Sequence, residues 1–150
     1  MNNKKYNFAF IVDAFQPFHN GHKALIDEAL KRANRVVVFI ENACESGTYD
    51  NPLPYTFRAS LIKNVYGTAL EVYPLHTTKS DDISPLWADT AIKQIEEFCN
   101  ATPDLFVTDT TRNSRAKWFE DFLSLDVDFV PKSDIGDFGV RKMYKDAKTD

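Results

Sequence analysis

Residues 8–22, FAFIVDAFQPFHNGH, join an apolar run to a polar segment that carries two histidines. The run from Phe8 to Val12 is continuous and apolar, as expected for a strand that is buried on both faces of a parallel sheet. From Leu25 onward, apolar residues recur at helical spacing. A buried strand that passes through a short polar segment into a helix is typical of the start of a βαβ unit. The stretch therefore predicts a parallel sheet with crossover helices.

The same alternation of strand and helix patterns continues along the chain. Apolar runs predict four further strands, at residues 36–40, 70–75, 105–108 and 127–130. Helices are predicted between them from apolar residues at helical spacing, which are Leu25, Ile26, Ala29, Leu30 and Ala33, then Phe57, Leu61, Ile62 and Val65 before a cap at Gly67, then Ile92, Ile95 and Phe98 after a start at Ser84-Pro85, then Trp118, Phe119, Phe122 and Leu123, with a last helix from Val140. Because such crossovers are right-handed, we expect a doubly wound, Rossmann-like α/β fold, a five-stranded parallel sheet with helices on both faces.

Length and composition agree with one globular domain. The chain has 150 residues, of which 43% are hydrophobic, and it includes 12 Phe, 6 Tyr and 2 Trp. It shows no internal repeat and no linker rich in Pro, Gly or Ser. We therefore expect a single domain that spans residues 1–150.

The charge balance and the N-terminal residues limit the expected partners and location. Lys and Arg number 18 and Asp and Glu number 22, which gives a formal charge of 18 − 22 = −4. A domain that grips nucleic acid usually has an excess of basic residues, so we expect no nucleic-acid partner. The apolar run that ends at Asp13 is too short for a signal peptide or a membrane span. Cys44 and Cys99 have no CxxC spacing, so neither a disulfide framework nor a zinc site is predicted, and we expect a cytoplasmic protein.

Two histidines flank a glycine where the first strand gives way to the first helix. In an open parallel sheet, ligands bind beyond the carboxyl ends of the strands, so His19, Gly21 and His22 lie at the expected ligand edge. Helix N-termini have unpaired N–H groups that stabilise anions, imidazoles can add hydrogen-bond donors, and glycine allows close approach of the backbone. These features predict a polyphosphate site. A histidine near a helix start can instead be a cap or a surface residue.

The segment FQPFHNGH resembles the HxGH motif of the nucleotidyltransferase superfamily, in particular the nicotinamide mononucleotide adenylyltransferases of the archaeal type. Asn51-Pro52 followed by Arg58 is similar to the NP…R segment of these enzymes. Trp87 falls where they have a tryptophan near the nicotinamide, and Arg141 stands where their closing S-[ST]-T-x-I-R motif places its arginine. The likeness covers about the whole chain, and its specific part is the HxGH stretch.

The resemblance implies transfer of AMP from ATP to nicotinamide mononucleotide, which yields NAD and pyrophosphate. It implies that His19, His22 and Arg141 are catalytic and hold the phosphates, and that Mg²⁺ enters with ATP and without a metal site of the protein itself. It further implies contacts with the nucleotide from Ala14, Phe15, Gln16, Gly21 and Thr108, and contacts with the acceptor from Asn51 and Trp87. Members of the family often assemble, so a homo-oligomer is expected by analogy.

The chain departs from the family pattern at several positions. Asp13-Ala14 stands where relatives usually have Gly-Arg, and Glu41-Asn42 where they commonly have Gly-Ser. Residues 136–141, GDFGVR, keep only an aliphatic residue and the arginine of the closing motif, and Thr108 begins a loop, TDTT, that lacks the usual glycine. Two interpretations stay open. In the first, the chain is a divergent transferase, in which Lys142, Arg112 or Arg115 supplies the lost positive charge, or which uses another acceptor or another nucleotide such as CTP. In the second, it is a catalytically silent nucleotide-binding domain.

Overall fold

The computed structural model describes residues 4–15, 17–41, 47, 53–76, 86–109, 117, 119–120 and 125–130. Its elements are, in chain order, β1 (Tyr6–Asp13), α1 (Asn20–Arg32), β2 (Ala33–Ile40), α2 (Tyr55–Tyr66), a 3₁₀ turn (Gly67–Ala69), β3 (Glu71–Pro74), α3 (Leu86–Cys99), β4 (Leu105–Asp109) and β5 (Asp126–Val130). All five strands are parallel and lie in the order β3-β2-β1-β4-β5. The predicted doubly wound parallel sheet is confirmed.

The order of the strands reverses at β1, which lies between β2 and β4. In the register, Phe10 of β1 stands opposite Val37 of β2 and Phe106 of β4. A reversal of strand order leaves a crevice at the carboxyl ends of the strands on either side of it, because their following segments leave in opposite directions. The fold therefore directs a ligand to the ends of β1 and β4.

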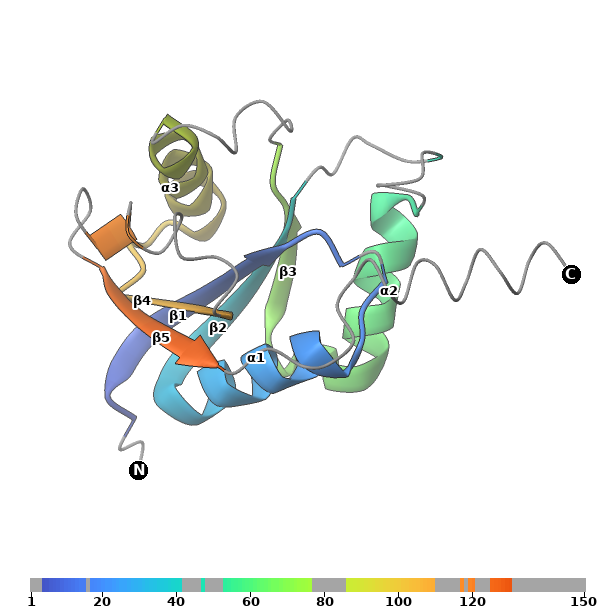
Figure 1. Cartoon of the computed structure of the whole chain (residues 1–150), viewed down its shortest axis with the longest axis horizontal. Coiled ribbons are helices and arrows are strands. Elements are labelled where there is room, and N and C mark those ends of the chain that lie inside the picture. The colour runs from blue at the N-terminus through green and yellow to red at the C-terminus, as the bar shows by residue number, and fades with distance from the viewer. Residues whose placement is uncertain are drawn as a thin grey trace, which may run out of the picture.

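Two hydrophobic layers cover the sheet, one on each face, because the side chains of β1 point alternately to the two sides. Ala9 and Ile11 pack with the buried residues of α1 and α2, whereas Phe10 and Val12 pack with those of α3. Figure 1 shows α1 and α3 on opposite sides of the strands. The near-continuous burial of β1 explains why its sequence shows no polar alternation before Asp13.

The structure confirms Ile62 of α2 and Ile92 and Ile95 of α3 as buried, and corrects other residues of the two predicted apolar faces. On α2 the buried side chains are Arg58, Ala59 and Ile62, whereas Phe57 and Val65 are exposed, at 48% and 53% of their surface. The helix is turned toward Arg58 because this side chain bonds to backbone carbonyls beneath it. On α3, Phe98 is 40% exposed, although its ring stacks on Tyr73 with centroids 5.2 Å apart.

Helix boundaries follow local chemistry in most places. Gly67 follows α2 with a φ of 57°, in the left-handed region that favours glycine, so the predicted cap is confirmed. Helical spacing predicts Ala33 in the preceding helix, but it is the first residue of β2. The predicted start at Ser84-Pro85, the helix residues Trp118, Phe122 and Leu123, and the helix from Val140 lie outside the described residues.

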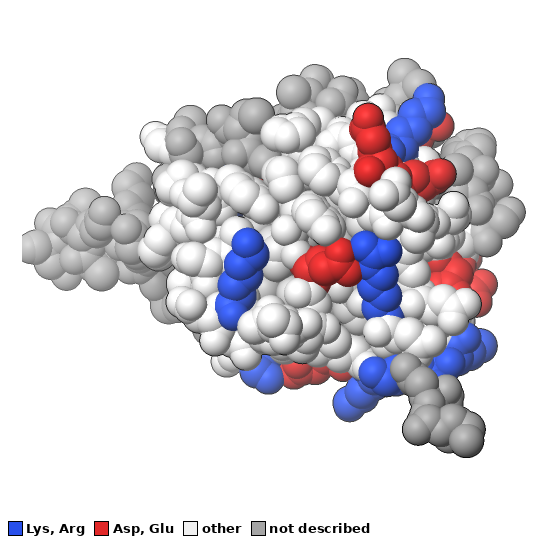
Figure 2. All heavy atoms as spheres, turned by 180° about the vertical axis from the view of Figure 1, so that it is seen from behind, with Lys and Arg blue, Asp and Glu red and all other residues white. Residues whose placement is uncertain are grey.

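On the face of the molecule that Figure 2 shows, acidic and basic side chains of the described residues are interspersed. An ion pair between Arg35 and Glu71 joins β2 to the edge strand β3. Arg35 Nε donates to Glu71 at 2.6 Å and Arg35 Nη2 donates to it at 2.8 Å, so the contact is bidentate. Among the helices that the structure describes, none has the length and apolar character needed to cross a membrane.

Candidate active site

The chain turns sharply between β1 and α1. Phe15 has a φ of 52°, in the left-handed region that a bulky L-residue rarely adopts. Its ring is fully buried and lies 4.4 Å from the ring of His22, centroid to centroid. Burial of the ring offsets the strain, which for such a backbone conformation is on the order of 1–3 kcal/mol. Strain of this kind is typical of functional sites, and here it directs the chain into the segment that carries the two histidines.

His19 and His22 form a reciprocal cap at the N-terminus of α1. His19 is the N-cap residue, and its Nδ1 accepts a hydrogen bond from the Gly21 N–H at 3.0 Å. The Nδ1 of His22 accepts from the His19 N–H at 3.2 Å. A nitrogen that accepts a hydrogen bond carries no hydrogen, so each neutral ring has its hydrogen on Nε2. The cap thus fixes both tautomers and makes each Nε2 a donor.

The two imidazoles are also held by stacking. Their ring centroids are 3.9 Å apart and the planes differ by 26°. His22 is buried beneath Phe15 and Phe18, whereas His19 is only half-buried. Because stacking and capping restrain the same rings, the two donors are positioned before any ligand arrives.

The N-terminus of α1, where the two histidines lie, favours binding of an anion. They stand at the N-terminus of a 13-residue helix, where the backbone dipoles favour negative charge. The first turn of α1, which the structure describes in full, holds no acidic side chain. The site also lies where β1 ends, beside the reversal of strand order. The expected ligand edge and the predicted phosphate donors therefore coincide.

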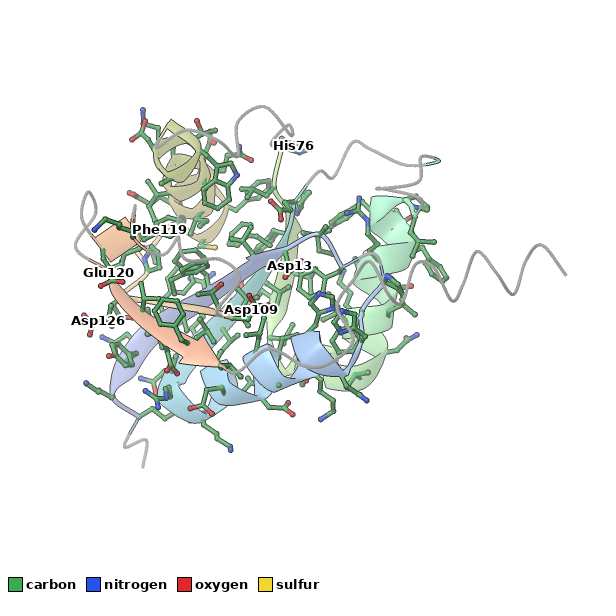
Figure 3. All side chains as sticks on the ribbon, viewed as in Figure 1. Asp13, His76, Asp109, Phe119, Glu120 and Asp126 are labelled. Carbon is green, nitrogen blue, oxygen red and sulfur yellow. The ribbon has the colours of Figure 1, made fainter. Side chains whose placement is uncertain are left out.

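A carboxylate approaches the same donors from the other side. Asp13, the last residue of β1, is 5% exposed and accepts a hydrogen bond from the Ala14 N–H at 2.7 Å. Its Oδ1 lies 3.6 Å from the Nε2 of His22. Figure 3 labels Asp13 where β1 ends and Asp109 where the neighbouring β4 ends. From the sequence, Asp13 was identified only as a departure from the family pattern. Its contact with His22 was not predicted.

Arg58 connects α2 to the segments that follow β1 and β2. Its side chain is fully buried, and Nη1 donates to the carbonyl oxygens of Ala14 and Glu41 at 2.9 and 3.0 Å. The backbone N–H of Glu41 in turn donates to the carbonyl oxygen of Asp13 at 3.0 Å. Arg58 therefore restrains the backbone on which the candidate site is built.

The remaining predicted site residues occupy different environments. Thr108 is buried near the end of β4. Trp87 is also fully buried, in the layer between α3 and the sheet, with its ring 5.7 Å from that of Phe119. The structure therefore places Trp87 in the core, and its ring has no exposed face for an acceptor to stack on. Gln16, Asn51 and Arg141 lie outside the described residues.

His76, just beyond the carboxyl end of β3, is exposed. Its backbone is nevertheless fixed, because Gln94 of α3 accepts from the His76 N–H at 2.9 Å and donates to its carbonyl oxygen at 3.1 Å. The side-chain amide of Gln94 thus pairs with the backbone beyond the end of β3. No sequence motif indicates this contact.

Comparison with known proteins agrees with this geometry. A family model described as cytidylyltransferase-like matches residues 11–124. A nicotinamide-nucleotide adenylyltransferase of Picrophilus torridus is 36% identical over 84 residues, which cover 53% of this chain and 47% of the relative. An enzyme of the same name from Methanolobus tindarius is 39% identical over 56 residues, 37% of this chain and 32% of the relative. The matches thus span about half or less of these relatives.

Solved structures show the same fold. A bifunctional NMN adenylyltransferase/ADP ribose pyrophosphatase from Francisella tularensis superposes with a TM-score of 0.77 at 20% identity and covers 95% of this chain and 43% of that one. A second structure with that description, in complex with AMP and a manganese ion, gives a TM-score of 0.76 at 18% identity over 94% and 42% of the two chains. Because the family model covers more than half of the sequence, including the segment with both histidines, the chain belongs to the cytidylyltransferase-like family.

Proposed function

We propose that this protein is an adenylyltransferase that transfers AMP from ATP to nicotinamide mononucleotide, with NAD and pyrophosphate as products. The observation that carries the proposal is the pair of stacked, capped histidines at the N-terminus of α1, with Nε2 of each ring as a hydrogen-bond donor. Support for the choice of substrates comes from the names of the curated relatives.

In this reaction a phosphate oxygen of the acceptor attacks the α-phosphorus of ATP, and pyrophosphate leaves from the opposite side. Such a displacement depends on positioning and on neutralising charge on the phosphate oxygens, not on a covalent intermediate with the protein. The Nε2 hydrogens of His19 and His22 and the N-terminus of α1 would stabilise that charge. Donors that are fixed in advance need no reorganisation as charge develops.

The further contacts with the nucleotide stay predictions. Ala14 and Gly21 already use their N–H groups within the protein, since these donate to Asp13 and His19. They would contribute by letting the backbone approach the phosphates. We assign the β- and γ-phosphates to Arg141 and keep Phe15, Gln16, Thr108 and Asn51 as proposed contacts. Trp87 is not proposed again as a ligand contact, because it is buried in the core.

A divalent cation, which we take to be Mg²⁺, would arrive as part of the nucleotide complex. In the described part of the chain, no group of three or more His, Cys, Asp or Glu side chains is arranged to hold a metal ion. Mg²⁺ is commonly bound by substrate phosphates and water with few protein ligands. The cation would reduce the charge of the triphosphate that the histidines receive.

The proposal is tested by measuring pyrophosphate release from ATP and Mg²⁺ with a panel of phosphorylated acceptors. Release that depends on nicotinamide mononucleotide, together with NAD as the product, is the expected result. Release only with another acceptor, or only with CTP in place of ATP, would replace the proposed substrates and keep the reaction class. Binding of ATP without release under any of these conditions would show a silent nucleotide-binding domain and contradict the proposal.

A further inference from the structure

The carboxylate of Asp13 lies beside two hydrogen-bond donors of the candidate site. Its carboxylate is buried and accepts the Ala14 N–H at 2.7 Å, and its Oδ1 lies 3.6 Å from Nε2 of His22. Both neighbours are N–H groups at the junction of β1 and α1. They are of the type that a phosphate oxygen would also use.

The contact matters because His22 has one hydrogen to offer when neutral. Its Nδ1 accepts from the His19 N–H, so its hydrogen is on Nε2, on the side of Asp13. A phosphate that uses this donor must approach a buried carboxylate. Repulsion between like charges is strong there, because a buried site is screened less than bulk water.

A buried guanidinium, that of Arg58, also lies in this region. Arg58 directs Nη1 to the carbonyl oxygens of Ala14 and Glu41 and so acts on the backbone below the site. Two more carboxylates stand at neighbouring strand ends, that of Glu41, which is buried after β2, and that of Asp109, which ends β4. Acidic residues therefore end or follow three neighbouring strands, β2, β1 and β4.

We propose that Asp13 is a specificity-determining residue, which competes with phosphate oxygens for the Nε2 hydrogen of His22 and so makes the site select cation-bound polyphosphates over metal-free ones. The inference rests on the proposed function in one respect, that a polyphosphate binds at residues 19–22. Repulsion by Asp13 scales with the net charge of the ligand, and a divalent cation lowers that charge. Metal-free ATP and pyrophosphate are thus penalised most.

The test compares D13N with the wild-type protein by isothermal titration calorimetry. Three ligands are titrated, namely ATP with excess Mg²⁺, ATP with a chelator and metal-free pyrophosphate. Removal of the charge is expected to strengthen binding of the two metal-free ligands about tenfold, and that of ATP with Mg²⁺ by about threefold or less. D89N is the matched control, because Asp89 is an exposed carboxylate on α3 paired with Lys93, and it should bind all three ligands as the wild-type protein does.

A gain in affinity cannot come from damage to the fold, which separates the proposed role from a merely structural one. Unchanged or weaker binding of metal-free ligands by folded D13N would overturn the inference, as would a failure of both proteins to bind any of the ligands. If D13N does not fold, D13A must show the same gain. Tighter binding without transfer to any acceptor would contradict the proposed function alone, whereas transfer with unchanged affinities in D13N would contradict this inference alone.

Discussion

The two histidines of the candidate site have the same tautomer but different surroundings. His22 is buried and stacked between aromatic rings, whereas His19 is half-buried and closes the cap. A buried donor with a fixed direction gains more from the low local dielectric than an exposed one. His22 is therefore expected to contribute strongly to the transition state.

Replacement of His22 with Ala should lower the rate of pyrophosphate release by about 10²–10³-fold or more, the usual effect of removing one donor to transition-state charge. Loss of its capping contact and of its buried ring contacts should lower the free energy of unfolding by about 2–4 kcal/mol. Initial rates and urea unfolding measure the two effects separately. His76→Ala, at an exposed position outside the site, is the control, and equal rates for the two variants would show that the motif has no catalytic role.

Arg58 is predicted to be a stabilising residue, because its buried guanidinium bonds to carbonyl oxygens after two different strands. Replacement with Met should lower the free energy of unfolding by about 2–4 kcal/mol, since two buried carbonyls lose a charged donor. Urea titration checks this. Lys93→Met, at an exposed ion pair with Asp89, should change it by less than about 1 kcal/mol. Equal losses in both variants would contradict the assigned role.

The sequence predicted the position of the two histidines but not their contacts. His19 and His22 were singled out because they flank a glycine after a buried strand, at the ligand edge of a parallel sheet, and the structure places them there. The burial of Arg58 was not predictable, because it depends on carbonyls that only the folded sheet brings together. The same holds for the φ of Phe15, since aromatic residues rarely adopt that conformation.

Element by element, α2 shows where apolar spacing misleads. The apolar spacing predicts a buried stripe of Phe57, Leu61, Ile62 and Val65, yet of these only Ile62 is fully buried, beside Arg58 and Ala59. A hydrophobic pattern identifies the helix but leaves its rotation open when polar contacts compete. The strands were predicted more closely, because continuous apolar runs leave no choice of face in a sheet that is covered on both sides.

The observed rotation of α2 predicts that substitutions at two apolar residues change the free energy of unfolding by very different amounts. Ile62→Ala should lower the free energy of unfolding by about 2–5 kcal/mol, because it leaves a cavity in the core. Phe57→Ser should change it by no more than about 0.5 kcal/mol, as expected for a surface position. Denaturant unfolding of both variants distinguishes the two faces. A larger loss for Phe57→Ser would mean that the predicted stripe is the buried face after all.

For the whole molecule, stability should fall in alkaline solution. Burial raises the pKa of the Cys99 thiol to about 11, from an ordinary value of about 9. The folded state thus favours the neutral thiol, so this contribution is complete below pH 9 and is lost as the pH rises toward 11. A hydrogen bond to Glu71 also raises the pKa of Tyr73, which adds to the decline.

Cys99→Ala isolates the part of this decline that is due to the thiol. The variant is expected to be less stable than the wild-type protein near neutral pH, because it loses a buried sulfur atom, and to lose less stability between pH 9 and 11. Urea midpoints measured at several pH values give both slopes. Parallel slopes for the two proteins would exclude Cys99 as the cause.

At this scale the alternation of strands and helices was sufficient to predict a doubly wound sheet, because right-handed crossovers leave few other topologies. The order β3-β2-β1-β4-β5 and the exact partners of each strand come from the structure. The family resemblance gives Trp87 a ligand contact, but a tryptophan on an amphipathic helix also suits a core, and here Trp87 packs against Phe119 in the core.

Helix α1 passes into β2 without a connecting loop, since Ala33 both caps the helix and begins the strand. One extra residue at this junction would turn each side chain of β2 to the opposite face of the sheet, exchanging its two core layers. Insertions and deletions should therefore be tolerated at other connections but selected against at residues 32–33. The number of residues between the histidine pair and the second strand should therefore be constant. A random insertion library scored for soluble expression should yield no soluble variants with insertions at residues 32–33.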